Sequence, residues 1–137
     1  MSKRFHMLQR MLLIAPLIAL LAGCETTLLG STAAGCATRA DPMLMPEHLP
    51  DGQVGVSYRQ SIEITNASTP THGFYVSDKT PLPAGLRIEH QDREAQALIK
   101  GIPTQAGHHK VHISVGTYGT QCVGLNAERT YNLRIVE

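Results

Sequence analysis

Tryptophan is absent from the 137-residue sequence, and aromatic residues make up only 4% of it. A buried core must therefore be built mainly from isoleucine, leucine and valine. Charged residues make up only 17%, and lysine and arginine are not gathered in one region. Because nucleic-acid binding requires a concentrated basic face, the sequence gives no case for a nucleic-acid partner.

Long apolar runs are also absent. The longest, residues 11–21, has about 11 residues, whereas a helix needs roughly 20 to span a bilayer. A permanent transmembrane helix is therefore not expected. The basic residues Lys3, Arg4 and Arg10 precede this run, and small residues follow it. This order predicts an export signal peptide in residues 1–23.

Leu21, Ala22, Gly23 and Cys24 close the apolar run. They resemble the lipobox of bacterial lipoproteins, in which a small residue precedes an obligatory cysteine. The resemblance implies cleavage before Cys24, a diacylglycerol on its thiol and, usually, a further acyl group on its amine. Because each buried methylene contributes about 0.8 kcal/mol, two or more acyl chains hold a protein firmly to a membrane. The alternative is an ordinary signal peptide that contains a cysteine.

The lipoprotein resemblance implies a location in the cell envelope. Glu25 follows the cysteine, where an aspartate often signals inner-membrane retention and glutamate is less diagnostic. We expect the outer membrane of a Gram-negative cell, facing the periplasm, with another envelope protein or a polysaccharide as partner. Removal of residues 1–23 takes away three of the 12 basic residues and none of the 11 acidic ones, which leaves a net charge of −2.

Two further cysteines follow Cys24. Because disulfides form and persist in an oxidising compartment, we expect Cys36 and Cys122 to pair with each other. Such a bridge closes a loop of about 86 residues and, on an entropic account, restricts the unfolded chain by roughly 4.5 kcal/mol. The alternatives are two thiols that stay reduced, or pairing with another chain.

We expect residues 24–41 to comprise the cysteine that the resemblance implies is lipidated and a tether, since residues 25–41 are rich in small and polar residues and show no sustained period. Residues 42–137 instead alternate apolar and polar side chains in short segments, which turn residues separate about every ten positions. The segments lie near Met43 and at 58–65, 74–76, 86–89, 95–100, 110–115 and 130–135. Alternation of period two buries one face of each strand. We therefore predict an all-β domain, an antiparallel sandwich of about seven strands in two packed sheets.

Three motifs in this domain resemble a known family. Residues 82–86 read LPAGL, residues 99–107 read IKGIPTQAG, and residues 49–58 read LPDGQVGVSY. Together they are similar to the immunoglobulin-like domains of bacterial surface proteins, which also resemble cadherin repeats. The similarity covers residues 45–136 and implies an immunoglobulin-like sandwich.

The chain departs from this family at Ile102, where threonine or serine is usual, and at His108 and His109, where an aromatic or small residue is usual. Gly85 and Gly107 of the motifs suit backbone angles that a side chain would resist.

His108, His109 and His112 are the densest group of possible metal ligands. On a helix, two of them would share a face one turn apart and would form a usable chelate. On the predicted strand, His108 and His112 lie about 13 Å apart, too far to hold one ion without a neighbouring strand. Calcium sites need grouped carboxylates, whereas Asp92 and Glu94 flank an arginine in an expected hairpin turn. We therefore expect no metal and no cofactor.

No catalytic constellation is evident in the sequence. A serine nucleophile needs a base and an orienting group, and none of the serines has a Gly-x-Ser-x-Gly context. Cys122 acting with a distant histidine is an alternative to the disulfide. We predict a protein without catalytic residues that serves protein–protein interaction or a structural role.

The glycine-rich loop at 116–124 is the most distinctive surface segment. It carries Tyr118, Thr120 and Gln121, and binding loops commonly lie at the ends of a rigid sandwich. We predict a binding loop here; the alternative is a long hairpin connection. A carbohydrate- or ligand-binding module would need exposed aromatics in a groove, for which Tyr75 and Tyr118 are the available residues. A metal-binding envelope protein is a further alternative.

Overall fold

The computed structural model describes residues 34–137, which divide after Arg39 into two units, the second being Ala40–Glu137. The predicted signal peptide and the lipidation of Cys24 lie outside the described residues. No helix in the described part of the chain is long and apolar enough to cross a membrane.

Residues 34–37 form a single helical turn in the segment that we expected to be an irregular tether. The hydroxyl of Thr38 donates a hydrogen bond to the carbonyl of Ala34 at 3.2 Å, which closes the turn at its carboxyl end. One turn is too short to produce an apolar stripe, so periodicity could not have predicted it.

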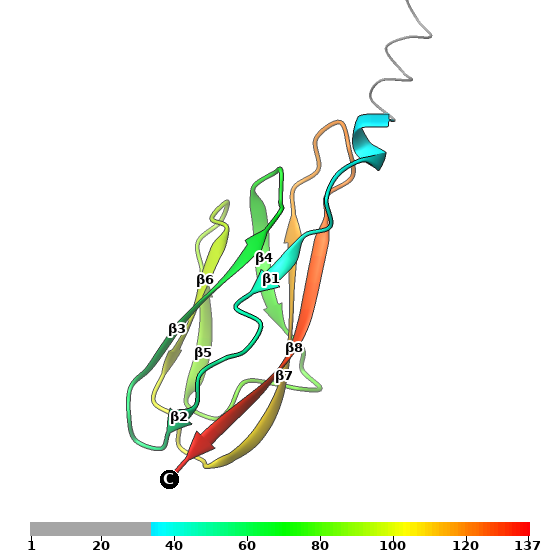
Figure 1. Cartoon of the computed structure of the whole chain (residues 1–137). Coiled ribbons are helices and arrows are strands. Elements are labelled where there is room, and N and C mark those ends of the chain that lie inside the picture. Colours follow the sequence, from blue (N-terminus) through cyan, green and yellow to red (C-terminus); the bar gives the residue numbers. More distant parts are fainter. Residues whose placement is uncertain (1–33) are drawn as a thin grey trace, which may run out of the picture. The chain divides into compact units, whose positions relative to one another are not determined.

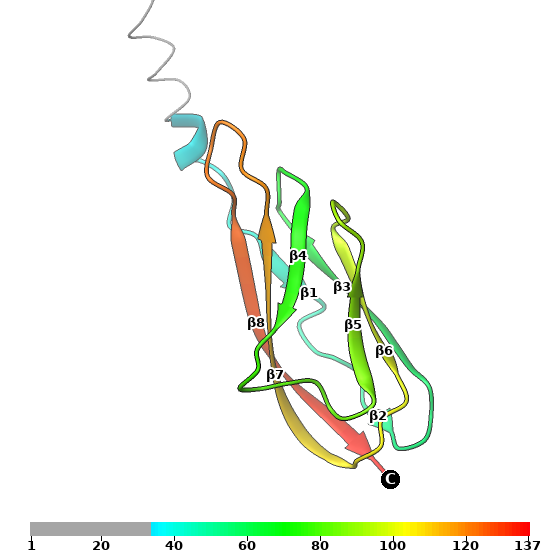
Figure 2. The same cartoon turned by 180° about the vertical axis from the view of Figure 1, so that it is seen from behind.

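The second unit is a sandwich of two four-stranded sheets (Figure 1 and Figure 2). One sheet has the order β1-β3-β6-β5, with the strands β1 (Met43–Met45), β3 (Tyr58–Thr65), β6 (Gln96–Gly101) and β5 (Leu86–His90). The other has the order β2-β8-β7-β4, with the strands β2 (Gly52–Gln53), β8 (Asn126–Val136), β7 (Gly107–Thr117) and β4 (Thr71–Val76). The predicted all-β sandwich is therefore confirmed, with eight strands rather than about seven. The strand missed is β2, whose two residues are too few to alternate and which pairs parallel to β8.

The strand order is that of an immunoglobulin domain. In the constant type, the first, second, fifth and fourth strands form one sheet, and the third, sixth and seventh form the other. When the short β2 is set aside, the remaining seven strands follow this order, as β1-β3-β6-β5 and β4-β7-β8. The domain is an immunoglobulin-like β-sandwich in which β2 extends the second sheet beyond β8.

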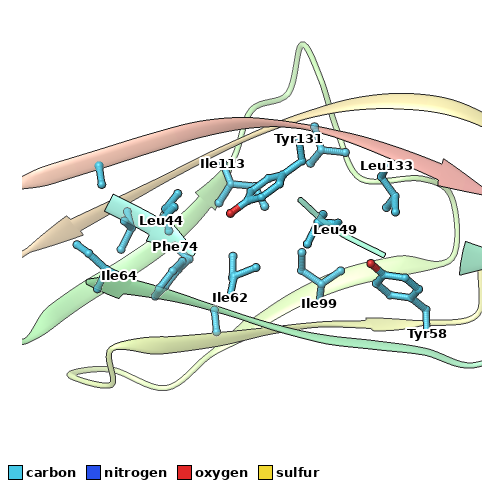
Figure 3. Close-up of a cluster of buried hydrophobic side chains, with 14 of the residues drawn as sticks. Leu44, Leu49, Tyr58, Ile62, Ile64, Phe74, Ile99, Ile113, Tyr131 and Leu133 are labelled. Carbon is cyan, nitrogen blue, oxygen red and sulfur yellow. The ribbon is translucent and has the colours of Figure 1, made fainter. Parts of the chain in front are cut away.

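Alternate side chains of the two sheets meet in one apolar core (Figure 3). Ile62 and Ile99 reach into it from one sheet, and Ile113 and Leu133 from the other, and all four are fully buried. Because burial of each such side chain contributes about 1.5–3 kcal/mol, this layer is the main source of stability. The core is aliphatic, as the shortage of aromatic residues predicts.

Two tyrosines complete the core (Figure 3). The hydroxyl of Tyr58 donates to the carbonyl of Pro50 at 3.1 Å, and burial, with the nearby charge of Asp51, raises the pKa of Tyr58 to about 12. The hydroxyl of Tyr131 is buried without a hydrogen-bond partner in the described part of the chain, and burial raises its pKa too.

The LPAGL and IKGIPTQAG motifs meet where β5 begins and β6 ends. The amide of Ile102 donates to the carbonyl of Gly85 at 3.2 Å. Gly85 has a φ of +91°, and a Cβ on it would overlap the carbonyl oxygen of Ile102. Gly107 has a φ of +144°, so the predicted need for unusual backbone angles at both glycines is confirmed. The motifs therefore encode a close crossing of two backbones.

Candidate functional site

Three rings form a row on the surface of the second sheet. The His72 ring centroid lies 5.9 Å from that of Tyr75 and 5.7 Å from that of Tyr118. The Tyr75 hydroxyl and Nδ1 of His72 share a hydrogen bond of 3.0 Å. Tyr75 is 52% exposed and Tyr118 39%. Tyr75 and Tyr118 are thus joined through His72, which lies between the predicted segments 58–65 and 74–76 and which alternation therefore leaves in a loop.

A β-bulge explains the position of His72. The ladder between β4 and β7 shifts register between Thr71 and Gly73. As a result Thr71 and Phe74, three residues apart, are both buried, and His72 and Tyr75, also three apart, are both exposed. Regular alternation would place residues three apart on opposite faces. The bulge therefore turns both rings to the outer face.

Tyr118 is tied to the turn between β5 and β6. Its hydroxyl donates to Oδ1 of Asp92 at 2.8 Å, and this hydrogen bond raises the pKa of Tyr118. The Arg93 guanidinium carbon lies 5.6 Å from the Tyr118 ring centroid, within the range of a cation–π contact. The Arg93 amide also donates to the carbonyl of Thr71 at 2.9 Å. Tyr118 therefore connects the row of rings to the turn between β5 and β6.

The loop predicted at 116–124 spans residues 118–125, because β7 continues to Thr117 and β8 begins at Asn126. The Thr117 amide donates to the carbonyl of Leu125, and the Leu125 amide donates to the Thr117 hydroxyl, each at 2.9 Å. Beyond this base, Thr120 and Gln121 are exposed, and the Thr120 amide donates to the carbonyl of Cys122 at 2.9 Å. A binding role for these two residues stays a prediction.

Cys36 and Cys122 are joined by a disulfide bond. Neither thiol is available as a nucleophile in this state.

A hollow of about 470 Å³ opens on the outer face of the second sheet, beside the row of rings. Its outward-facing wall comes from three adjacent strands and comprises His72, Tyr75, Ser114, Gly116, Asn126 and Glu128. The volume lies within the roughly 300–1,000 Å³ of small-molecule sites in proteins. Other hollows on the described surface have similar volumes, about 440–560 Å³, so the two exposed rings in its lining, rather than its size, make this hollow the candidate binding site.

Strand register assembles the hollow from two cross-strand rows. In one row, Ser114 of β7 pairs with Tyr75 of β4 on one side and with Glu128 of β8 on the other. In the next outward-facing row, Gly116 pairs with Gly73 and with Asn126. Two neighbouring glycines leave the centre of this second row without side chains.

The neighbouring rings occupy the space above these glycines. A Cβ on Gly73 would lie 2.5 Å from the Tyr75 hydroxyl oxygen, and one on Gly116 would overlap the His72 ring. The same Cβ on Gly116 would lie 3.0 Å from Oδ1 of Asn126. Glycine at these positions therefore leaves room for the hydroxyl end of Tyr75 and for the His72 ring close to the backbone of the sheet.

One carboxylate gives the hollow its charge. Glu128 is 73% exposed, and its Oε2 lies 3.6 Å from Nε2 of His112. Nδ1 of the same histidine shares a hydrogen bond of 3.0 Å with the hydroxyl of Thr130. The hollow thus offers one carboxylate, one amide, one hydroxyl and two rings, a set suited to hydrogen bonding and ring contact.

The three histidines considered as metal ligands are separated by the strand. His108 and His112 face outward four residues apart, as their positions opposite Arg134 and Thr130 show. His109 faces the other way, and its Nε2 is buried without a hydrogen-bond partner among the described residues. Within residues 34–137 no group of three or more potential metal ligands is gathered.

Ion pairs occupy the outer face of the opposite sheet. Glu89 lies 2.6 Å from Lys100 and 2.9 Å from Arg87, and hydrogen bonds from these two residues lower the pKa of Glu89. Both outer faces of the sandwich therefore carry charged side chains, and the outer face of the second sheet carries exposed rings as well.

Comparisons of the sequence with family models and with curated proteins found no match. Similar solved structures include PapD-like domain 7 of human CEP192, with a TM-score of 0.48 and 11% identity over 71% of this chain and 86% of that one. The titin M3 domain has a TM-score of 0.40 and 16% identity over 69% and 97% of the two chains. The R347E mutant of the SrpA adhesin from Streptococcus sanguinis has a TM-score of 0.48 and 9% identity, over 71% of this chain and 56% of that chain. The immunoglobulin-like fold is assigned from the order of the strands in the two sheets.

Proposed function

We propose that the protein is a lipid-anchored, non-catalytic binding module of the bacterial envelope. It is held to the outer membrane through Cys24 and presents the hollow of β4, β7 and β8 to an envelope partner. The observation that carries the proposal is the joint placement of exposed rings and polar side chains around one hollow of ligand size.

The partners of the histidines support recognition rather than catalysis. A serine nucleophile requires a base within hydrogen-bond reach. Around Ser114, the nearby histidines are bonded to other groups: His72 to Tyr75, and His112 to Thr130. Among the described residues, neither histidine ring makes a hydrogen bond to a serine hydroxyl.

The proposed anchor rests on the sequence before the sandwich. A cysteine that follows an apolar run and two small residues carries the acyl chains of a lipoprotein, and residues 25–41 link it to the domain. Changing Cys24 to alanine would then move the protein from the membrane fraction to the soluble fraction. Continued recovery in membranes would refute the anchor.

Retention of envelope components on immobilised protein tests the binding face. The wild-type chain should retain a partner from detergent-solubilised envelopes, and the double variant Tyr75→Ala, Asn126→Ala should not. Asn132→Ala is the matched control, because Asn132 lies on the same face of β8, opposite Lys110 and outside the hollow. Equal retention by all three proteins would contradict a role for the hollow. Loss only after replacement of residues 118–121 would instead assign binding to the loop.

A further inference from the structure

The hollow has a chemical character that points to a class of ligand, and this step rests on the proposed function. We infer that the hollow binds a neutral saccharide, with a sugar ring against Tyr75 and its hydroxyls hydrogen-bonded to Asn126, Ser114 and Glu128. The arrangement across three strands carries the inference, because Tyr75 and Glu128 lie on either side of Ser114 in one cross-strand row.

Tyr75 provides a fixed aromatic surface. Its ring lies over Gly73, and its hydroxyl is hydrogen-bonded to His72, so the ring has little freedom left to lose when a ligand binds. An aromatic face carries partial negative charge, which favours contact with the polarised C–H groups of a sugar ring. A rigid tyrosine therefore offers contact area at low entropic cost.

The polar side chains match a set of neighbouring hydroxyls. The amide of Asn126 both donates and accepts, the hydroxyl of Ser114 does the same, and the carboxylate of Glu128 accepts. Neighbouring hydroxyls on a sugar also donate and accept, so each can be satisfied by this set. In the register of the sheet, Asn126 lies two residues before Glu128 on β8, and both face outward.

Charge distinguishes a neutral sugar from other ligands. The single carboxylate of Glu128 opposes the binding of acidic sugars and phosphates, since like charges repel. A cationic ligand is best held by a cage of several aromatic faces, whereas Tyr75 is the one tyrosine that lines the hollow. A neutral ligand rich in hydroxyls fits both features.

Gly116 permits a test that leaves the known contacts of the core intact. Its backbone carries no positive φ, and the atoms that a Cβ would meet belong to the exposed side chains of His72 and Asn126. Gly116→Val would therefore displace the His72 ring and occupy the hollow while β7 keeps its pairing with β8. The variant should bind no sugar and still unfold cooperatively.

The experiment titrates the detergent-solubilised full chain with neutral tetrasaccharides of glucose, mannose, galactose and N-acetylglucosamine, and with a sialylated tetrasaccharide. Calorimetry should show binding of at least one of the neutral probes and no binding of the acidic probe. Tyr75→Ala should weaken binding about tenfold, equivalent to about 1.4 kcal/mol, because it removes the aromatic face against which the sugar ring packs. Tyr75→Phe, which keeps the ring, should change it by less than about threefold. The control Asn132→Ala should bind as the wild type does.

Three results would overturn the inference. They are no binding of any neutral probe, tighter binding of the sialylated probe, and neutral binding that survives both Tyr75→Ala and Gly116→Val. If the sugars fail but an envelope protein is retained in a Tyr75-dependent manner, the saccharide is wrong and the binding module stands. If neither a sugar nor an envelope component depends on Tyr75, both proposals fail.

Discussion

The close crossing at Gly85 leads to a quantitative prediction. Gly85→Ala should destabilise the domain more than a comparable change at any glycine with open space around it. Alanine at positive φ costs about 1–2 kcal/mol in backbone strain alone. At Gly85 the added Cβ also overlaps the carbonyl oxygen of Ile102, which belongs to a backbone that cannot rotate away.

The overlap adds a second cost. Relief requires the two backbones to separate, which disrupts the hydrogen bond between the Ile102 amide and the Gly85 carbonyl, now 3.2 Å long. Loss of that bond contributes about 1 kcal/mol, so the total is about 2–3 kcal/mol. For a domain of this size, such a loss lowers Tm by about 8–24 °C.

Gly55→Ala is the matched control. Gly55 has a φ of +75°, and a Cβ there would meet nothing within 4 Å. It should therefore cost only the strain of about 1–2 kcal/mol. Urea denaturation followed by far-ultraviolet circular dichroism measures both variants. Equal destabilisation of the two would refute the claim that the family motifs encode a rigid backbone contact.

Further predictions concern the buried tyrosines and the disulfide. Tyr131→Phe should leave the free energy of unfolding in urea unchanged or raise it, because the variant removes a buried hydroxyl without a partner in the described chain. Tyr58→Phe loses the hydrogen bond to Pro50 and should lower the free energy of unfolding by about 1 kcal/mol. Burial raises the pKa of Tyr58 from 10.0 to about 12, so unfolding releases a proton at high pH. The contribution of this group to the free energy of unfolding is therefore fully present below pH 10 and should fall between pH 10 and 12. The fall should be smaller in Tyr58→Phe. A fall of equal size in that variant would contradict the assignment to Tyr58. Replacing both Cys36 and Cys122 by serine should lower the free energy of unfolding by about 2–5 kcal/mol, measured without reductant; an unchanged value would show that the bridge does not constrain the unfolded chain.

Much of the fold could be predicted from alternation. The predicted segment 58–65 coincides with β3, and 95–100 differs from β6 by one residue at each end. Alternation succeeds there because one face of each strand packs on the core and the other meets water. It underestimated β7, which starts at Gly107 and ends at Thr117, because glycines near both ends leave no side chains to alternate.

The candidate site was harder to predict from the sequence. Tyr75 and Tyr118 were named as exposed aromatics, yet nothing in their spacing shows that His72 joins them. The bulge beside Thr71 breaks alternation, so His72 falls in a segment that the pattern assigns to a loop. Asn126 and Glu128 lie more than 50 residues along the chain from Tyr75, and only sheet register brings them together. The one available signal was the pair of glycines, Gly73 and Gly116, within strands that otherwise carry side chains.

The most direct test of the account is to map the binding face by nuclear magnetic resonance. Amide chemical shifts of the isotope-labelled protein would be followed during titration with the neutral tetrasaccharide that binds best. The account predicts shifts concentrated on residues 72–75, 114–116 and 126–128, with Lys110 and Asn132 of the same sheet unaffected. Shifts confined to residues 118–124, or to the outer face that carries Glu89 and Lys100, would contradict it.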